Sequence, residues 1–274
     1  MRAHRLVTLA ACLLFSLQAF SAGEAQHLLD THFQNKVLFI RGFYSDSKLA
    51  YDAQGNVKGT PSVGPWSLAL FRVDFCYARQ GEFVLGGKRA AEVYDRDKNK
   101  FVTTLPPKTE DLQITVEAPS DTISDATLDA LADRMFESRI TSDEVPEWWR
   151  PFFSRQQKAL KDYAGGNPIP GLELHGEPVF RAAQGRVTPP KLLAHSEPKY
   201  QEIARQAKYQ GITVLNLIVS KEGVPQRLEV VKPLGMGLDD NAVETVRNWR
   251  FSPAMLNGQP VPVLISVEVN FRLF

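Results

Sequence analysis

The sequence predicts an α+β protein of two domains: an N-terminal domain rich in antiparallel β-strands that also carries helices, and a C-terminal domain that mixes helices with strands. Three observations lead to this prediction. The chain has 274 residues, more than the ~150 of a typical single domain. Residues 36–118 form short runs of β-branched and aromatic residues between Gly, Pro and Asn turns, which is typical of strands. From residue 200 onward, helical and strand periodicities follow one another along the chain.

The composition excludes several classes of protein. Hydrophobic residues make up 43% of the chain, enough for a packed core, so a wholly disordered protein is excluded. The 32 basic and 31 acidic residues nearly cancel, which argues against nucleic acid as a partner. The only long apolar run lies at the N-terminus, so the sequence does not encode several membrane-spanning helices.

Residues 1–25 have the layout of a secretory signal peptide. Two arginines precede an apolar run at residues 6–20, and residues 23–25 provide a small-x-small cleavage site before Gln26. We therefore expect an exported chain that contacts the membrane only if this segment stays uncleaved. One alternative is an uncleaved anchor in the inner membrane, although the run is shorter than the ~20 residues of a bilayer span. Another is a lipoprotein box at residues 9–12.

The first domain, residues 26–164, is expected to contain an antiparallel sheet or small barrel followed by helices. Gly86-Gly87 is interpreted as a turn between two of its strands. The strands are predicted at residues 37–40, 67–77, 82–85, 90–94 and 112–116.

The periodicity becomes helical after residue 120, and Ser124 is the predicted N-cap of a first helix. A second helix is expected at residues 155–163. One side of the first helix is apolar, with Ile123, Leu128, Leu131, Met135 and Phe136. An aromatic cluster precedes the second helix and consists of Trp148, Trp149, Phe152 and Phe153. Such a cluster either forms the floor of a ligand pocket or, as we favour here, packs a helix against a sheet.

Residues 165–186 are rich in Gly and Pro and are interpreted as a linker, with at most one short strand at residues 177–181. The second domain then covers residues 187–274.

The second domain is predicted to alternate helices and strands. A first helix ends at Gly211, and residues 212–219 form a strand that is apolar on both faces. A strand at residues 226–232 and a helix capped by Asp239 follow. Apolar residues then occupy every odd position of residues 261–274, which predicts a strand with one buried face. At ~3.4 Å per residue this strand would extend to roughly 50 Å, far beyond the usual length.

No motif for catalysis or metal binding stands out. Residues 95–99 imitate the start of a calcium loop, but Lys100 and Pro106 replace the Gly and Glu that such a loop needs. The histidines are scattered, and after cleavage Cys76 is the only cysteine, so no internal disulfide can form. We therefore predict a non-enzymatic protein without catalytic residues, metal site or cofactor.

Residues 187–274 contain a series of short motifs in a fixed order: Pro198-Lys199-Tyr200, Ala204 with Gln210-Gly211, Lys221-Glu222-Gly223, Leu238-Asp239, Trp249-Arg250-Phe251-Ser252-Pro253-Ala254, Asn257-Gly258 and Val267-Glu268-Val269-Asn270-Phe271. In this combination they resemble the TonB C-terminal domain family, the periplasmic end of bacterial energy transducers. The resemblance implies two helices on a three-stranded antiparallel sheet. It also implies a partner, the extended TonB box of an outer-membrane transporter, which adds as a strand beside the last strand of the domain.

These observations together predict a periplasmic protein that binds an envelope partner through the edge of its last strand, in energy-coupled transmembrane transport. An exposed strand edge is a template for β-augmentation. The alternative is that the N-terminal domain or a second copy of the chain, in a homodimer, covers this edge. The predicted partner-binding residues are Val263, Leu264, Ile265, Ser266, Val267, Glu268, Val269, Asn270 and Phe271.

The chain departs from typical transducers in two features that keep a second function open. A folded β-rich domain stands where transducers carry a long Pro-rich spacer, and Tyr200-Gln201 stands where the family often has Tyr-Pro. The alternative function is a periplasmic ligand-binding or assembly protein that uses the TonB-like domain for structural interaction or dimerisation.

Overall fold

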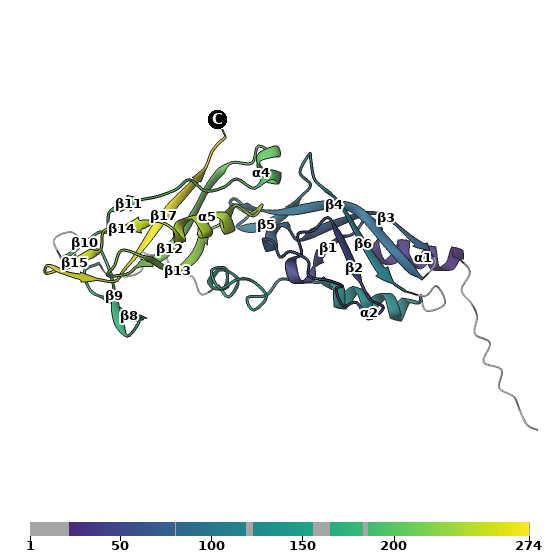
Figure 1. Cartoon of the computed structure of the whole chain (residues 1–274), viewed down its shortest axis with the longest axis horizontal. Helices are drawn as coiled ribbons and strands as arrows, with labels where there is room; N and C mark the ends of the chain where they lie inside the picture. The colour runs from purple at the N-terminus through teal and green to yellow at the C-terminus, as the bar shows by residue number, and fades with distance from the viewer. Residues whose placement is uncertain (1–21, 80, 119–122, 156–164, 183–185, 274) are drawn as a thin grey trace, which may run out of the picture.

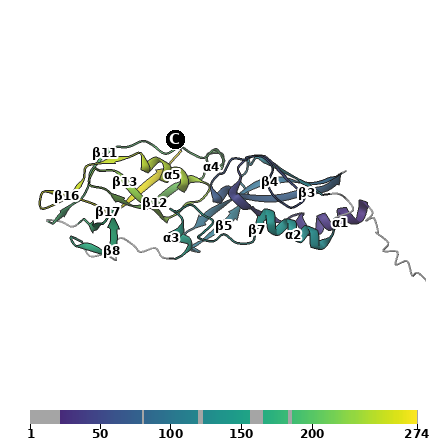
Figure 2. The same cartoon turned by 60° about the horizontal axis from the view of Figure 1, so that its bottom comes forward.

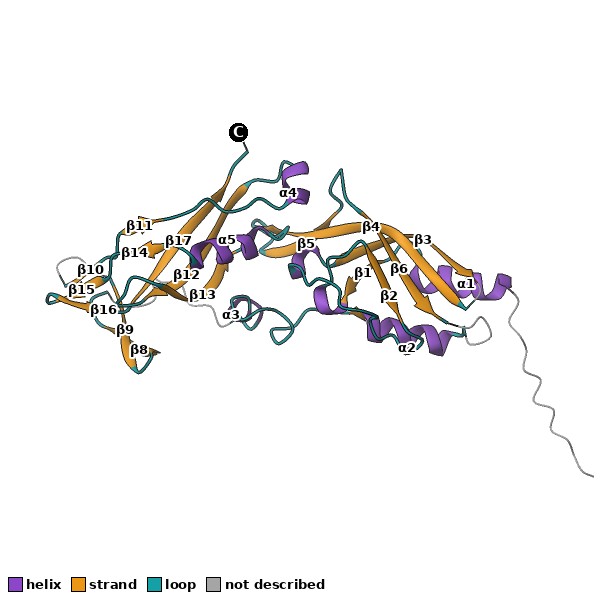
Figure 3. Cartoon of the chain, viewed as in Figure 1, coloured by secondary structure: helices purple, strands orange, loops and turns teal. Residues whose placement is uncertain are grey.

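The computed structural model describes residues 22–79, 81–118, 123–155, 165–182 and 186–273. These residues form a mixed α+β structure with two larger sheets, arranged one after the other along the long axis of the molecule (Figures 1 and 3). The predicted α+β class is therefore confirmed. Among the described residues, no helix combines the length and apolar character needed to cross a bilayer.

The N-terminal sheet has seven strands in the order β2-β6-β4-β3-β1-β7, with β5 paired to the far end of β4. All neighbours are antiparallel except β2 and β6, which are parallel. Two short 3-10 turns, Arg41–Phe43 and Trp66–Leu68, connect its strands. The strands are β1 (Val37–Ile40), β2 (Lys48–Tyr51), β3 (Leu70–Arg79), β4 (Glu82–Asp95), β5 (Lys100–Thr104), β6 (Asp111–Glu117) and β7 (Phe136–Glu137).

The glycine pair predicted as a turn lies instead inside β4, which is a single strand across both predicted segments. A Cβ on Gly86 would lie 2.1 Å from Cζ of Phe75, and a Cβ on Gly87 would lie 1.9 Å from the carbonyl oxygen of Arg72. The glycines therefore allow β3 to approach β4 closely where β3 bulges between Val73 and Phe75.

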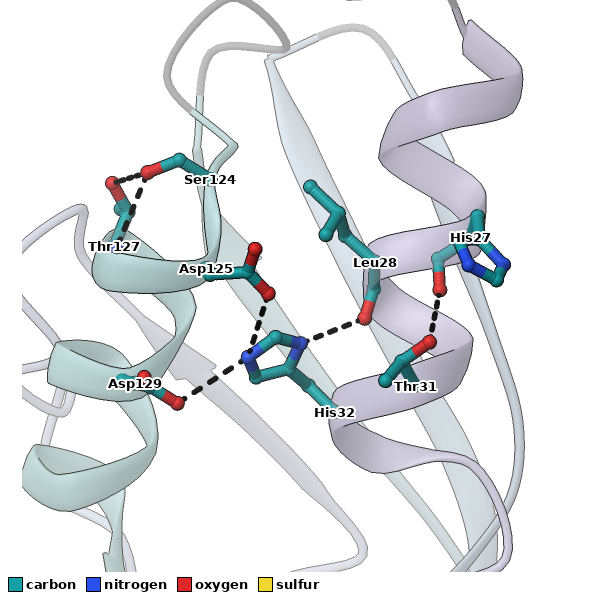
Figure 4. Close-up of polar contacts among 8 residues, drawn as sticks. All are labelled: His27, Leu28, Thr31, His32, Ser124, Asp125, Thr127 and Asp129. Atoms are coloured by element: carbon teal, nitrogen blue, oxygen red, sulfur yellow. Dashed lines mark hydrogen bonds and ion pairs between the residues drawn. The ribbon is translucent and has the colours of Figure 1, made fainter.

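Two helices, α1 (Ala22–Phe33) and α2 (Asp125–Met135), pack on one face of the N-terminal sheet (Figure 2). The predicted N-cap of α2 is confirmed, because Oγ of Ser124 accepts the backbone N–H of Thr127 at 3.3 Å. His32 links the two helices: Nδ1 lies 2.9 Å from the Leu28 carbonyl oxygen (Figure 4). Its Nε2 faces carboxylates of α2, at 3.5 Å from Asp125 and 3.3 Å from Asp129.

Part of the predicted N-terminal organisation lies outside the described residues. Residues 1–21, which hold the apolar run of the predicted signal, are not described, and the predicted cleavage site before Gln26 lies within α1. The helix predicted at residues 155–163 also lies almost wholly outside the described residues. The described helix there is α3 (Arg150–Phe153).

The C-terminal sheet has five strands in the order β13-β12-β17-β9-β8. Helices α4 (Glu202–Gln206) and α5 (Leu238–Arg247) belong to the same part of the chain. Two small sheets, β10-β15-β16 and β11-β14, lie beside it. The strands are β8 (Pro168–Leu174), β9 (Glu177–Arg181), β10 (Val187–Thr188), β11 (Leu192–Ala194), β12 (Gly211–Val219), β13 (Pro225–Lys232), β14 (Arg250–Phe251), β15 (Ala254–Leu256), β16 (Gln259–Val261) and β17 (Val263–Phe271).

Three features of the C-terminal part differ from the expectations. The sheet has five strands rather than three, because the short strand predicted at residues 177–181 forms β9 and joins it, together with β8 from the predicted linker. The last strand begins at Val263, since Val261 belongs to a β15–β16 hairpin that turns at Asn257-Gly258. Gly237, with a positive φ of 70°, occupies the N-cap position of α5 that was predicted for Asp239.

One hydrophobic cluster joins the two sheets, while a second cluster, with α1 and α2, belongs to the N-terminal sheet alone. Trp149 is fully buried, and its ring meets that of Trp66 edge-on at 5.3 Å. The aromatic cluster thus packs α3 against the sheets, as favoured from the sequence. The backbone is continuous as well: Tyr94 N–H donates to the Leu234 carbonyl at 2.7 Å, and Met236 N–H donates to the Glu92 carbonyl at 2.8 Å.

Candidate functional site: the open edge of the last strand

Strand β17 is paired with β12 along its whole length. Nine antiparallel residue pairs join the two strands, from Gly211 opposite Phe271 to Val219 opposite Val263. The odd positions of β17 face the shared core, where Val269 and Phe271 are buried and the ring of Tyr200 meets Phe271 edge-on at 5.5 Å. This face therefore fixes the strand in the fold and is not available to a partner.

The other side of β17 is covered only at its beginning. Strand β9 pairs with it in parallel at two positions, Phe180 opposite Val263 and Arg181 opposite Leu264. The N–H of Phe180 donates to the carbonyl of Pro262 at 2.9 Å. Within the part of the chain that the structure describes, residues 265–271 pair with β12 alone. We call residues 265–271 the open edge.

The direction of the backbone groups on the open edge follows from the β9 contact. Because the carbonyl of Pro262 points to β9, and backbone groups alternate along a strand, the even positions of β17 point to the same side. Ser266, Glu268 and Asn270 therefore present their N–H and C=O groups to the open edge. The odd positions direct theirs to β12.

The outward face beside the open edge is polar. Ser266, Glu268 and Asn270 are exposed, and Ser266 Oγ lies 2.6 Å from Oδ1 of Asn216 on β12. A strand added here would gain backbone hydrogen bonds at the edge and contacts with a hydroxyl, a carboxylate and an amide on the solvent side.

The predicted partner-binding residues therefore fall into two groups. Val263 and Leu264 already have a strand on both sides, whereas residues 265–271 are open on one side. Sequence reasoning missed the role of β9. The sequence feature that could have indicated this role is the apolar pair Val179-Phe180 within the Gly- and Pro-rich segment. Both residues are buried.

A pair of buried carboxylates lies at the start of α5, away from the open edge. Asp239 accepts hydrogen bonds from the Thr213 hydroxyl at 2.6 Å and from the N–H groups of Leu234 at 2.9 Å and Gly235 at 2.7 Å. Burial raises the pKa of Asp239 to about 7, against the lowering effect of these hydrogen bonds. Asp239 thereby ties α5 to β12 and to the segment that joins β13 to α5.

Asp240 holds the junction between the two sheets. Its Oδ1 accepts the indole N–H groups of Trp148 at 3.0 Å and Trp149 at 3.1 Å. Its other oxygen, Oδ2, is buried and has no hydrogen-bond donor among the described residues, although part of the residue reaches the surface. Burial raises the pKa of Asp240 to about 6. These contacts assign both aspartates a structural role.

A cavity of about 360 Å³ also lies between α4 and the N-terminal sheet. Arg89 lines it, but its guanidinium donates to the carbonyls of Tyr44, Asp46 and Leu68 at 3.2, 3.0 and 2.9 Å. Among the described residues, no group of three or more His, Cys, Asp and Glu side chains is arranged to hold a metal ion.

Residues 196–273 match the family model described as Gram-negative bacterial TonB protein C-terminal. Protein TonB of Vibrio cholerae is 29% identical over 100 residues, which cover 34% of this chain and 41% of that protein. Protein tonB2 of Pseudomonas aeruginosa is 31% identical over 82 residues, covering 30% of each chain. The chain thus spans less than half the length of these two relatives.

Among solved structures, the chain is similar to the Pseudomonas aeruginosa TonB CTD determined by solution NMR. The two are 18% identical, with a TM-score of 0.26, and the match covers 31% of this chain and 86% of that one. The family match covers the helices and strands that surround the open edge, from α4 to β17. The match of residues 196–273 to the family model confirms the resemblance that the sequence predicted.

Proposed function

We propose that this chain is a non-enzymatic periplasmic protein that binds an outer-membrane transporter by strand addition, in energy-coupled transmembrane transport. The TonB C-terminal domain would receive a TonB-box-like extended peptide along residues 265–271. The observation that carries the proposal is the open edge itself, which lies in a domain of this family and lacks a second strand among the described residues.

The backbone chemistry of the open edge suits this role. Three edge-facing residues offer six hydrogen-bonding groups, and each bond contributes about 0.5–1.5 kcal/mol net. After the cost of ordering the peptide, the remaining affinity is modest, which suits a partner that must be released. Strand β9 sets the start of the site, because it already occupies the positions of Val263 and Leu264.

Energy coupling would require a connection to the inner membrane. The N-terminal segment supplies it if residues 1–25 stay uncleaved, and otherwise a second protein must do so. Fractionation of cells that express the whole chain distinguishes the two cases. An uncleaved chain in the inner-membrane fraction favours direct transduction, whereas a free periplasmic chain that begins at Gln26 requires an anchored partner.

Strand addition can be tested because the N–H groups of even and odd positions of β17 point to opposite sides of the strand. Glu268→Pro removes an N–H that faces the open edge, whereas Val267→Pro removes one that faces β12. We expect the Glu268→Pro chain to fold and to bind the TonB-box peptide of a purified outer-membrane transporter at least tenfold more weakly, as measured by fluorescence anisotropy. The Val267→Pro chain should lose stability because it breaks the β12–β17 ladder.

Glu268→Ala serves as the matched control, since it removes the carboxylate but keeps the backbone donor. It should bind the peptide nearly as well as the unmodified chain. A folded Glu268→Pro chain with unchanged affinity would rule out strand addition at this edge.

The same edge also supports the assembly function. Two copies that pair their open edges would form a two-fold dimer without any other partner. Sedimentation of the full chain tests this alternative. A dimer that dissociates in the Glu268→Pro variant would favour assembly over transporter binding.

A further inference from the structure

A second surface with binding chemistry lies on the N-terminal sheet, on the face turned away from α1 and α2. Alternate residues of β3, β4 and β6 pack into the core with these helices, among them Cys76, Leu85 and Ile114. The residues between them therefore point outward. The strand registers arrange these outward residues in rows that run across the sheet.

The two central rows carry an aromatic pair. One row contains Phe75, Gly86, Gln113 and Lys48, and the next contains Tyr77, Val84, Thr115 and Ala50. Phe75 is 52% exposed and Tyr77 is 39% exposed. Their rings are nearly parallel, at 11°, with centroids 6.3 Å apart. Two large aromatic rings are thus presented to solvent side by side along one strand.

Gly86 allows the ring of Phe75 to lie low over the sheet. A Cβ at this position would come within 2.1 Å of Cζ of Phe75 and within 2.4 Å of Cε2, so no larger residue fits beneath the ring in this position. The result is a low aromatic platform with the Gln113 amide and the Thr115 hydroxyl in the adjoining strand.

The rows on either side of the platform are charged but neutralised. On one side Arg72 pairs with Asp74 at 2.7 Å, and Lys88 pairs with Asp111 at 2.5 Å. On the other side, Arg79 forms an ion pair with Glu82, and Glu117 forms one with Lys58. The acidic and basic side chains of these two flanking rows therefore satisfy one another, and the charge in the two central rows is the ammonium group of Lys48.

From this arrangement we propose that the platform binds an uncharged oligosaccharide, with the apolar faces of consecutive sugar rings against Phe75 and Tyr77. A sugar ring has one face of C–H groups, which packs on aromatic rings, and a rim of hydroxyl groups, which needs hydrogen-bonding partners. The Gln113 amide, the Thr115 hydroxyl and the Lys48 ammonium group, which share these two rows, provide such partners.

The charge and size of the platform favour a saccharide over macromolecular partners. Aromatic platforms that stack nucleic-acid bases are set in a positively charged groove, which the neutralised rows do not provide. A stable protein interface buries about 800 Å² on each partner, and the large apolar side chains exposed on this face are essentially Phe75 and Tyr77 with Val37. A small, flat, uncharged ligand matches the platform better.

The proposal is tested by titrating the full chain with cellotetraose, chitotetraose and maltotetraose while backbone amide resonances are followed by NMR. We expect at least one of these sugars to shift the amides of residues 75–77 and 84–86. Phe75→Ala and Tyr77→Ala should each weaken binding at least tenfold. Gly86→Ala should do the same with both aromatic residues present, because its methyl group displaces the Phe75 ring.

Leu193→Ala is the matched control, since Leu193 is an apolar residue of the C-terminal part that is 68% exposed. It should leave sugar binding unchanged. The proposal is overturned if none of the three sugars binds at millimolar concentration, or if they bind equally well without the aromatic rings. It is also overturned if Phe75→Ala and Tyr77→Ala abolish self-association of the chain instead, since the platform would then be a protein interface.

Discussion

At the scale of single residues, the two aspartates of α5 show how burial and hydrogen bonding compete. Both carboxylates are removed from water, which favours the protonated form. Asp239 accepts hydrogen bonds from three donors, whereas Oδ2 of Asp240 has none within the described part of the chain. The two carboxylates accept hydrogen bonds from two indoles and from the turn before α5. Their ionisation therefore opposes the stability of the fold that they organise.

This opposition makes stability depend on pH. The pKa values of Asp239 and Asp240 are raised from 3.8 to about 7 and about 6. Between these values and the unfolded value, the native state binds more protons than the unfolded state, so stability falls as pH rises through this range. We expect the free energy of unfolding to decrease by at least about 1 kcal/mol from pH 5 to pH 8. Urea denaturation at a series of pH values measures it.

Asp240→Asn provides the control for this pH dependence. Its amide oxygen can still accept from the indoles of Trp148 and Trp149, but the side chain no longer ionises. The decrease in stability between pH 5 and pH 8 should therefore be smaller in the variant. A wild-type stability that is constant or rises over this range would contradict the proposed role of the buried carboxylates.

At the scale of secondary-structure elements, the sequence pattern predicted those strands and helices that depend mainly on their own residues. Strand β1 was predicted at its observed bounds, and the alternation of odd and even positions identified β17. The Gly86-Gly87 pair was misread because glycines at a turn and glycines at a close strand contact look alike in sequence. The distinction depends on Phe75 and Arg72 in the partner strand.

The open edge was only partly predictable for the same reason. The alternation of apolar and polar residues in β17 predicts a strand with one buried face. It does not predict which strands pair with its two edges. Strand β9 covers Val263 and Leu264 from a segment far away in the sequence, where a short strand was predicted within a linker but its pairing with β17 was not. The register of a strand and the identity of its neighbouring strands depend on residues far away in the sequence, so they could be read only from the structure.

The contribution of the Ser124 N-cap to the stability of α2 can be tested by mutation. Ser124→Ala removes the acceptor of the Thr127 N–H, and we expect it to lower the free energy of unfolding by about 1 kcal/mol. Thr31→Ala in α1 is the matched control, because its hydroxyl donates to a carbonyl within an exposed helical turn (Figure 4). Denaturation with urea should show a smaller effect for Thr31→Ala. Equal effects would contradict the capping role of Ser124.

At the scale of the whole molecule, a shared hydrophobic cluster joins the two sheets, although the N-terminal sheet also has a cluster of its own with α1 and α2. The backbone of residues 234–236 lies beside β4, with Val93 bridged to Gly235, so the segment before α5 extends the pairing of the N-terminal sheet. A Cβ on Gly235 would lie 2.2 Å from the carbonyl oxygen of Glu92. This close approach leaves little space between this segment and β4. The open edge and the aromatic platform are thus carried by one connected body.

Trp149 takes part in this connection through its ring and its indole N–H. It is fully buried, contacts the rings of Trp66 and Phe101, and donates its indole N–H to Asp240.

The full chain should therefore unfold in one cooperative transition, measured by amide exchange at β4 and at β12. Trp149→Ala should lower the free energy of unfolding by about 3–5 kcal/mol. In this variant the amides of β4 and those of β12 should exchange in two different transitions. Leu193→Ala, at an exposed position, should preserve the single transition. If β4 and β12 already exchange independently in the unmodified chain, the domains are not coupled through this core, and strand addition at β17 would leave the N-terminal sheet unaffected.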